Sequence, residues 1–366
     1  MRLNRILSYL FVGALAMGFS ACEDMDDYDS RMPQSSETPG GEAPESVVTD
    51  AFVKGADVSW LTEMEVNNKK FYDAEGTEME CMSLLKSLGT NAVRLRVWVN
   101  PVDGWCSKMD VLAKAMRANR LGLRIMIDFH YSDVWADPAN QIVPTAWAEY
   151  SYEDMKKAVA AHTTDVLSAL KVWDITPEWV QVGNETRSGM LGEMGSASSN
   201  PAQYAGLHNA GYDAVKAIFP EAKVIVHVDN GYDTARNWLF KSLKDNGGKF
   251  DMIGLSHYPW SAVDDGKCTD WKDCNDKLIT NIQTLANAYS VDVMVVEFGY
   301  PASEAATAKD CLQDLMTQGN AISCCAGVMY WEPQSYDWKS YGNGAFSTDG
   351  KPTIALDPFK SIYRQQ

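Results

Sequence analysis

Basic residues are scarce in this sequence, and several common enzyme motifs are absent. The 366 residues include 32 Lys and Arg against 49 Asp and Glu, which gives a formal net charge of −17. Nucleic-acid phosphates need clustered cations, so we expect no nucleic acid partner. The chain has no G-x-x-x-x-G-K-[ST] phosphate loop and no HExxH zinc motif. We therefore expect no cofactor and no metal; the rival interpretation is a metal hydrolase with His130, Asp133 and Asp137 as ligands.

The apolar run near the N-terminus is too short to cross a bilayer comfortably. Arg2 and Arg5 precede "ILSYLFVGALAMGF", and small residues and Cys22 follow it. A basic head, an apolar stretch and small residues are typical of a secretory signal, which we place at residues 1–21. "FSAC" resembles the lipobox of bacterial lipoproteins, although Phe19 stands where Leu is usual. We expect lipid on Cys22 and anchoring to the outer membrane; the alternative is secretion without lipid.

Residues 22–50 contain few large apolar side chains and many acidic, Ser, Pro and Gly residues. Such a segment cannot bury enough apolar surface to offset the entropy lost on ordering. It is therefore predicted to be a flexible acidic tether between the lipid and the folded domain, which would display the protein at the cell surface.

Seven cysteines remain apart from Cys22, and none has the spacing of a zinc ribbon. They are Cys81, Cys106, Cys268, Cys274, Cys311, Cys324 and Cys325. Because the number is odd, at least one thiol stays unpaired within the chain. Cys268 and Cys274 are close enough in sequence to close a short disulfide loop in an oxidising compartment, and buried inert thiols are the simplest interpretation of several others.

Residues 51–366 alternate apolar, β-favouring runs with helical patterns, without a second linker. The strand candidates are 52–59, 91–99, 123–130, 179–185, 223–230, 250–258, 291–299 and 327–333. Helical patterns include 109–122, with Gly122 as its C-terminal stop, and 201–220, with Pro201 in its first turn. Eight strands alternating with helices predict an α/β fold, a single (β/α)8 TIM barrel.

Polar and aromatic residues cluster where these strands end. They are Asp57, Arg96, Trp98, Asp128, His130, Asn184, Glu185, His227, Asp229, His257, Tyr258, Glu297, Trp331 and Glu332. Helix capping could account for a few of them, including Asn184. Histidines and a carboxylate at so many ends are better explained by an active site at the C-terminal rim of the barrel.

Two glutamates end the fourth and seventh strands, in "WVQVGNE" and "VMVVEFG". These strands face each other across a small barrel, so Glu185 and Glu297 are expected to meet. Two carboxyls about 5 Å apart suit a retaining glycosidase, in which one is the acid/base and the other the nucleophile.

The motifs resemble those of the clan A retaining glycosidases, and more narrowly glycoside hydrolase family 53, the endo-β-1,4-galactanases. The resemblance rests on "KGADVSW", "NAVRLRVWVNP", "IDFHYSDVWADPANQ", "VQVGNE", "HVDNG", "IGLSHYPW", "VEFGYP" and "YWEP", in this order from Lys54 to Pro333. It implies Glu185 as acid/base and Glu297 as nucleophile. Residues implied to shape the −1 sugar site are Arg96, Asn184, His257, Tyr258 and Trp331; Asp128, His130, Trp135 and Asp137 belong to the third-strand motif beside it.

The chemistry of these residues leads to further expectations. Arg96 is the cation expected to lower the pKa of Glu297, and Tyr258 could orient that carboxylate. Asn184 would hydrogen-bond the sugar 2-hydroxyl. Glu332 should point away from Trp331 and form a structural salt bridge. His227 and Asp229 could be either sugar contacts or buried hydrogen-bond partners.

The expected partner is β-1,4-galactan, cleaved outside the cell by a monomeric enzyme. Two alternatives stay open. One is another clan A retaining β-1,4-glycanase, such as a mannanase. The other is a non-catalytic glycan-binding lipoprotein, which would not need both glutamates.

Overall fold

The computed structural model describes residues 51–361 and residue 363. The predicted signal peptide (1–21), the lipidation site Cys22 and the tether (22–50) lie outside the described residues. Within the described part, no helix is long and apolar enough to cross a membrane.

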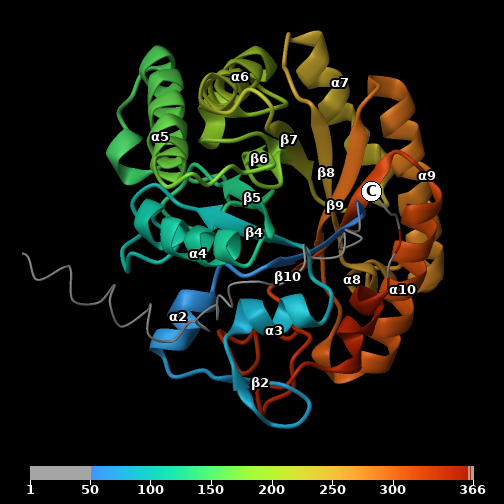
Figure 1. Ribbon diagram of the computed structural model, residues 1–366. Helices are drawn as coiled ribbons and strands as arrows, with labels where there is room; N and C mark the ends of the chain where they lie inside the picture. The colour runs from blue at the N-terminus through green and yellow to red at the C-terminus, as the bar shows by residue number, and fades with distance from the viewer. Residues whose placement is uncertain (1–50, 362, 364–366) are drawn as a thin grey trace, which may run out of the picture. The chain divides into compact units, whose positions relative to one another are not determined.

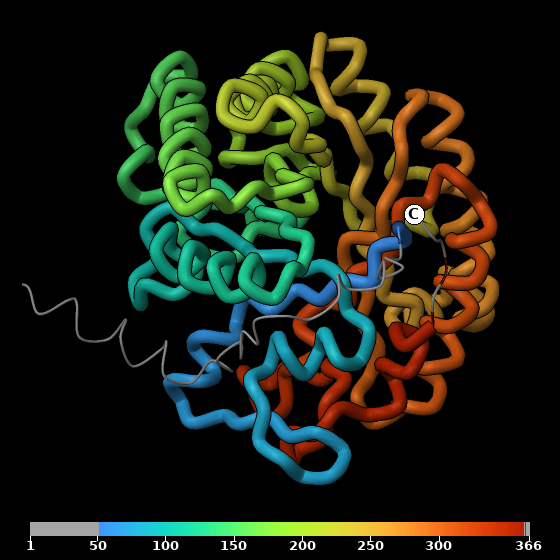
Figure 2. Tube along the Cα trace, in the orientation of Figure 1, coloured from blue at the N-terminus to red at the C-terminus, as the bar shows by residue number. Residues whose placement is uncertain are grey.

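Eight parallel strands close into a barrel (Figure 1). They are β1 (Val53–Asp57), β4 (Ala92–Val97), β5 (Arg124–Phe129), β6 (Trp179–Val182), β7 (Lys223–Val228), β8 (Met252–His257), β9 (Asp292–Phe298) and β10 (Cys325–Trp331). The first strand pairs with the last, and Figure 2 follows the chain from the blue β1 to the orange-red β10. The predicted (β/α)8 barrel is confirmed, and every predicted strand contributes to it.

Helices surround the ring on its outer side (Figure 1). The longer ones are α4 (Lys108–Arg120), α5 (Tyr152–Val172), α6 (Pro201–Ile218), α7 (Trp238–Asp245), α9 (Trp271–Tyr289) and α10 (Ala305–Ala321). Short elements in the loops are α2 (Leu61–Val66), α3 (Cys81–Ser87), α8 (Pro259–Asp264) and the β2–β3 hairpin (Phe71–Tyr72, Glu78–Met79). Pro201 occupies the first turn of α6, and Gly122 follows α4 with φ +66°, so both predicted boundary signals are confirmed.

The alternation of side chains along each strand separates two apolar cores. On β4, Val93, Leu95 and Val97 point outward into the large core between the strands and the helices. Ala92 points inward, into a smaller core that plugs the barrel with residues such as Met126 and Trp179. Every second residue above this plug therefore projects toward the barrel axis, where the polar residues of the candidate site lie.

One strand breaks this alternation. Met294 and Val296 of β9 belong to the inner core, so the next inward position by simple alternation would be Phe298. The pairing of β9 with β8 shifts by one residue between Leu255 and Ser256, and Phe298 belongs to the outer core. This β-bulge turns Glu297 inward directly after Val296, as bulges beside active sites commonly do.

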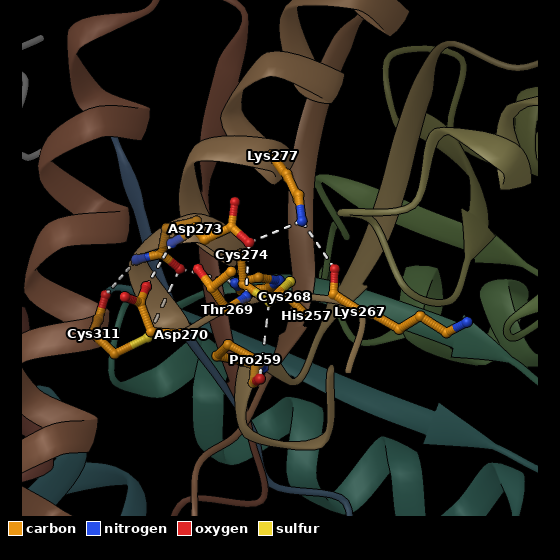
Figure 3. Close-up of a disulfide and its surroundings, with 11 residues drawn as sticks. His257, Pro259, Lys267, Cys268, Thr269, Asp270, Asp273, Cys274, Lys277 and Cys311 are labelled. Carbon is orange, nitrogen blue, oxygen red and sulfur yellow. Dashed lines mark hydrogen bonds and ion pairs between the residues drawn. A yellow bond between two sulfur atoms is a disulfide. The ribbon is translucent and has the colours of Figure 1, made fainter. Parts of the chain in front are cut away.

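A disulfide joins Cys268 to Cys274 across six residues of sequence (Figure 3). It links the segment after α8 to the first turn of α9, and both cysteines are buried. The proposed short loop bridge is thus present. Cys81, Cys106 and Cys311 are also buried and do not take part in it.

Candidate active site

Arg94 lies at the centre of the polar interior above the apolar plug. It is 1% exposed and forms ion pairs with Asp57 (2.8 Å), Asp128 (2.9 Å) and Glu297 (3.0 Å). Its Nη2 also donates to Oδ1 of Asn184 at 2.9 Å. This single guanidinium therefore connects residues from β1, β5 and β9 and the turn after β6.

Arg94, and not Arg96, is the cation beside the expected nucleophile. Arg96 comes two residues later on the same strand, and its Nη1 approaches Glu332 at 3.5 Å. Its guanidinium lies 4.0 Å from the ring centroid of Trp135. Two residues along a strand correspond to a displacement of about 7 Å, which carries Arg96 past the carboxylate that Arg94 reaches. The expectation that Arg96 holds the pKa of Glu297 down is wrong.

Glu332 forms the buried ion pair with Arg96 that alternation along β10 indicated. It is fully buried and accepts hydrogen bonds from the Trp60 backbone N–H (3.1 Å) and from Gln334 Nε2 (2.6 Å). All of its described partners are structural, which separates it from the two glutamates expected to be catalytic.

Glu297 is 6% exposed, and two groups hold its carboxylate. Arg94 contacts Oε1, and the Tyr258 hydroxyl donates to Oε2 at 3.0 Å. The contact that we expected between Tyr258 and Glu297 is therefore present. The two oxygens are held from β4 and from the residue that follows β8, so the carboxylate has a defined orientation.

Glu185 stands in a turn that ends β6. Gly183 has φ +84°, and Glu185 itself adopts a left-handed conformation with φ 45° and ψ 52°. A non-glycine residue in this region is uncommon and often marks a functional turn. The half-buried carboxylate accepts a hydrogen bond from Ser256 Oγ at 2.6 Å. Ser256 is the register partner of Glu297 on the neighbouring strand, so the two glutamates share one site.

The surroundings of the two carboxyls differ in charge. Burial raises the pKa of Glu185 well above its ordinary value, and the negative charge of Glu297 raises it further. Burial also raises the pKa of Glu297, but the adjacent Arg94 guanidinium and the Tyr258 hydroxyl oppose that rise. Of the pair, Glu185 is therefore the carboxyl that keeps its proton, and Glu297 is the one that ionises first.

Asn184 is fixed from both ends of its amide. Its Oδ1 accepts from Arg94 and from Gln181 Nε2 (3.0 Å), and its Nδ2 donates to the Ala136 carbonyl at 2.8 Å. Gln181 is fully buried and also donates to Asp128 at 2.5 Å. These bonds define the position of the turn that carries Glu185.

Asp128 lies near the C-terminal end of β5, and His130 directly follows that strand. Asp128 is fully buried and accepts from Arg94, Gln181 and His130 Nε2, the last at 3.1 Å. His130 Nδ1 accepts from the indole N–H of Trp98 (3.3 Å) and from the Ala136 backbone N–H (3.1 Å). Because these partners are protein groups, Asp128 acts on the site through Arg94 and not by presenting an oxygen to a sugar.

Aromatic rings form one wall above the carboxylates. Trp331 and Trp135 are half-buried, with ring centroids 5.7 Å apart, and both pack against Trp60. Tyr341 lies 4.8 Å from Trp331. Trp331, expected to shape the sugar site, and Trp135, expected beside it, therefore belong to one aromatic cluster at the C-terminal ends of β5 and β10.

His257 does not join this site. It is fully buried, and its Nε2 bonds Asn275 of α9 at 2.9 Å. Figure 3 shows His257 among the residues of the disulfide region. Alternation explains this placement, because Ser256 faces the barrel axis and the following residue must face the helices. The expectation that His257 shapes the sugar site is wrong.

The proposed metal ligands are held by protein donors. Asp133 accepts backbone N–H groups from Asn100 and Thr145, and Asp137 accepts from Ala139 and Asn140 in a local turn. Among residues 51–361 and 363, no group of three or more His, Cys, Asp or Glu side chains is arranged to hold a metal ion.

Sequence reasoning missed Arg94, Gln181 and Ser256, and left His227 undecided. The structure places His227 as a fully buried hydrogen-bond partner, with Nε2 2.8 Å from Ser256 Oγ. Arg94 and Gln181 lie deeper in the barrel than the strand ends that we considered. Counting inward positions by twos from the apolar plug would have selected all four residues.

Comparison with known proteins agrees with this geometry. The model of glycosyl hydrolase family 53 matches residues 53–354. An uncharacterized protein of Niallia circulans is 40% identical over 260 residues, covering 69% of this chain and 68% of its own length. An endo-β-1,4-galactanase of Bacillus subtilis is 29% identical, with 80% of this chain and 75% of that protein covered.

Solved structures give the same result. A fungal β-1,4-galactanase superimposes with a TM-score of 0.76 at 28% identity, covering 86% of this chain and all of that one. The family 53 catalytic domain of Ignisphaera aggregans gives a TM-score of 0.75 at 27% identity, over 87% of this chain and all of that one. With the barrel and the paired glutamates described above, these matches establish that the chain is a glycoside hydrolase and belongs to glycosyl hydrolase family 53.

Proposed function

We propose that the protein is a retaining endo-β-1,4-galactanase that hydrolyses β-1,4-linked galactan by double displacement. The observation that carries the mechanism is the unequal environment of the two glutamates. Glu297 is beside Arg94, whereas Glu185 forms no ion pair with a cation among residues 51–361 and 363. Relatives described as endo-β-1,4-galactanases support the substrate.

In the first step, protonated Glu185 donates its proton to the glycosidic oxygen as Glu297 attacks the anomeric carbon. The leaving chain departs as an alcohol, and a glycosyl-enzyme ester forms on Glu297. Arg94 then loses its ion pair with Glu297, because the ester on Glu297 is neutral. Its remaining partners, Asp57 and Asp128, keep the guanidinium in place.

In the second step, Glu185 is ionised and acts as a base. It removes a proton from water, which attacks the anomeric carbon and releases Glu297 as a carboxylate. The ester on Glu297 no longer carries the charge that raised the pKa of Glu185. Each half-reaction therefore leaves Glu185 in the protonation state that the next one requires.

We also propose that the enzyme acts outside the cell, anchored to the outer membrane by lipid on Cys22. The lipobox-like "FSAC" and the acidic segment 22–50 support this location. An external, acidic protein suits a neutral polymer that is too large to enter the cell. We expect a monomer.

The substrate is tested by a reducing-end assay on purified β-1,4-galactan, mannan, xylan and a soluble cellulose. We expect galactan to be cut fastest. Glu185→Gln and Glu297→Gln should each lower turnover by on the order of 10²- to 10⁴-fold. Glu149→Gln, at an exposed glutamate, is the matched control and should retain wild-type activity. Faster cleavage of mannan would replace the proposed substrate, and full activity of either catalytic-site variant would overturn the assigned roles.

The stereochemistry is tested by proton NMR of the first products. Double displacement releases the new reducing end initially as the β-anomer. An initial α-anomer would exclude the glycosyl-enzyme intermediate on Glu297.

A further inference from the structure

A line of hydrogen bonds connects the backbone N–H of Glu185 to its own carboxylate through His227 and Ser256. Ser256 Oγ contacts Glu185 Oε1 at 2.6 Å, and His227 Nε2 contacts Ser256 Oγ at 2.8 Å. The other ring nitrogen, His227 Nδ1, lies 3.2 Å from the backbone N–H of Glu185 itself. The imidazole and the hydroxyl thus form a closed loop with the residue that they support.

The donors around His227 fix its tautomer. The backbone N–H of Glu185 can only donate, so Nδ1 accepts from it. Asn184 Oδ1 also lies 3.0 Å from Nδ1, but this oxygen already accepts from Arg94 and Gln181. Gln181 Nε2 also points at Nδ1, at 3.0 Å, and the amide of Gln181 is oriented by Arg94, which donates to its Oε1. The ring proton is therefore on Nε2. Burial and the positive charge of Arg94 lower the pKa of His227 well below its ordinary value, so the ring stays neutral.

This tautomer determines the direction of the next bond. Nε2–H donates to Ser256 Oγ, so the hydroxyl hydrogen is directed elsewhere. Within the described chain, the acceptor in reach of that hydroxyl is Oε1 of Glu185. The carbonyl oxygen of a carboxylic acid is a better acceptor than its hydroxyl oxygen, so a hydrogen bond to Oε1 favours the acid proton on Oε2.

We propose that His227 and Ser256 form a one-way hydrogen-bond relay that engages Oε1 of Glu185 and keeps the acid proton on Oε2. The two are positioning residues, because neither touches the reacting atoms. The inference rests on the proposed acid/base role of Glu185. In that role, Oε2–H protonates the glycosidic oxygen, the bond to the anomeric carbon breaks, and Oε2 later takes a proton from the attacking water.

Several charged groups face Glu185 and influence its pKa. Glu297 on β9 and Asp229 after β7 raise the pKa of Glu185, and Arg94 on β4 lowers it. Asp229 is itself paired with Arg187 at 3.1 Å. The Tyr258 hydroxyl stays protonated, because burial and the negative charges of Glu297 and Glu185 raise its pKa well above its ordinary value. A substitution at Ser256 leaves all of these groups in place.

The test is a carboxyl titration by carbon-13 NMR on protein labelled at glutamate Cδ, with Glu185 assigned from its missing signal in Glu185→Gln. Ser256→Ala removes a hydrogen bond to the charged form, so the pKa of Glu185 should rise by about one pH unit. Ser256→Thr keeps the hydroxyl and should restore the wild-type value. Ser335→Ala removes an equally buried hydroxyl that has no described hydrogen-bond partner, and should leave the titration unchanged.

Two results would overturn the relay. One is an unshifted Glu185 titration in Ser256→Ala; the other is an equal shift in Ser256→Thr. The order of the relay is tested by His227→Asn, which keeps an acceptor for the Glu185 N–H but loses the donor to Ser256. Because His227 acts through Ser256, adding this change to Ser256→Ala should give no further shift, and fully additive shifts would contradict the order.

Kinetics on galactan provide a second measurement. In Ser256→Ala, the alkaline limb of the kcat/KM profile should move to higher pH by the same amount as the carboxyl titration. A purely structural defect would lower the rate without moving the limb. The NMR titration requires no substrate. If the wild-type protein does not cut galactan, the proposed substrate fails while the relay is still tested.

Discussion

At the scale of single residues, the site depends on one guanidinium with several acceptors. Arg94 neutralises part of a cluster made of Asp57, Asp128 and Glu297, and burial makes each of these ion pairs depend on the others. Removing Arg94 would leave three buried carboxylates without their common cation. The nucleophile is therefore better probed through its second partner, the Tyr258 hydroxyl.

Tyr258→Phe should move the acidic limb of the kcat/KM profile to higher pH by about one unit. The Tyr258 hydrogen bond lowers the pKa of Glu297, so its loss raises that pKa, and Glu297 must be ionised to attack. At pH values well above the acidic limb, the variant should lose less activity relative to the wild type than at pH values below it. Tyr131→Phe is the control, since its hydroxyl bonds Thr163 on the helix side; an unmoved acidic limb in Tyr258→Phe would contradict the role of Tyr258.

At the scale of elements, apolar runs predicted all eight strands, because burial on both faces of a parallel strand leaves a continuous apolar signature. Side-chain direction was harder to predict. Near the end of β8, Ser256 and His257 are adjacent, and only the inward phase of the strand separates the site residue from the packing residue. Residue type favoured the histidine, while the geometry of the strand selects the serine.

The choice between Arg94 and Arg96 shows a second limit. Both side chains point toward the barrel axis, so alternation along the strand does not distinguish them. They differ in their height along the axis, and only Arg94 lies level with Glu297. Depth depends on the shear of the closed barrel, which sets the neighbours of each strand position and is not encoded in one strand alone. Likewise, nothing in "VMVVEFG" signals the extra residue that turns Glu297 inward.

The disulfide belongs to the same scale, because it fastens the start of α9 to the preceding segment. Cys268→Ser combined with Cys274→Ser should lower the free energy of unfolding by about 2 kcal/mol, the value expected for closing so short a loop. Denaturant unfolding with and without a reducing agent measures this. The wild-type protein should lose stability on reduction and the double variant should not. Equal stability of oxidised and reduced wild type would contradict the prediction.

At the scale of the whole molecule, the buried carboxyls make stability depend on pH. The pKa of Glu185 is raised in the folded state, so its stabilising contribution is full below the unfolded value and is lost as pH rises toward the folded value. Glu185→Gln has no such titration. The melting temperature of this variant minus that of the wild type should therefore become more positive as pH increases from 4 to 8, as measured by calorimetry.

Glu149→Gln, at an exposed position, is the control for this comparison and should melt with the wild type at every pH. A constant difference between Glu185→Gln and the wild type across the range would show that burial does not perturb the ionisation of Glu185. The same measurement on Glu297→Gln should give a smaller trend, because Arg94 opposes the rise in the pKa of Glu297.

The location of the protein is also a property of the whole chain. Cys22→Ala should move the enzyme from the detergent-extracted membrane fraction to the soluble fraction of a Gram-negative host, because the lipid would have no attachment site. Incorporation of labelled palmitate into the wild type, and not the variant, checks this directly. Labelling of both proteins would exclude Cys22 as the anchor.

The irregular step in β9 has a further consequence for how such barrels diversify. If β9 paired regularly with β8 through this step, with no residue removed, Val296 would lie opposite Ser256 and Glu297 would face the layer of helices. A barrel paired in that way would keep its strands and lose its reaction. A one-residue change of pairing at a rim strand is therefore a route by which one barrel can gain or abandon an activity.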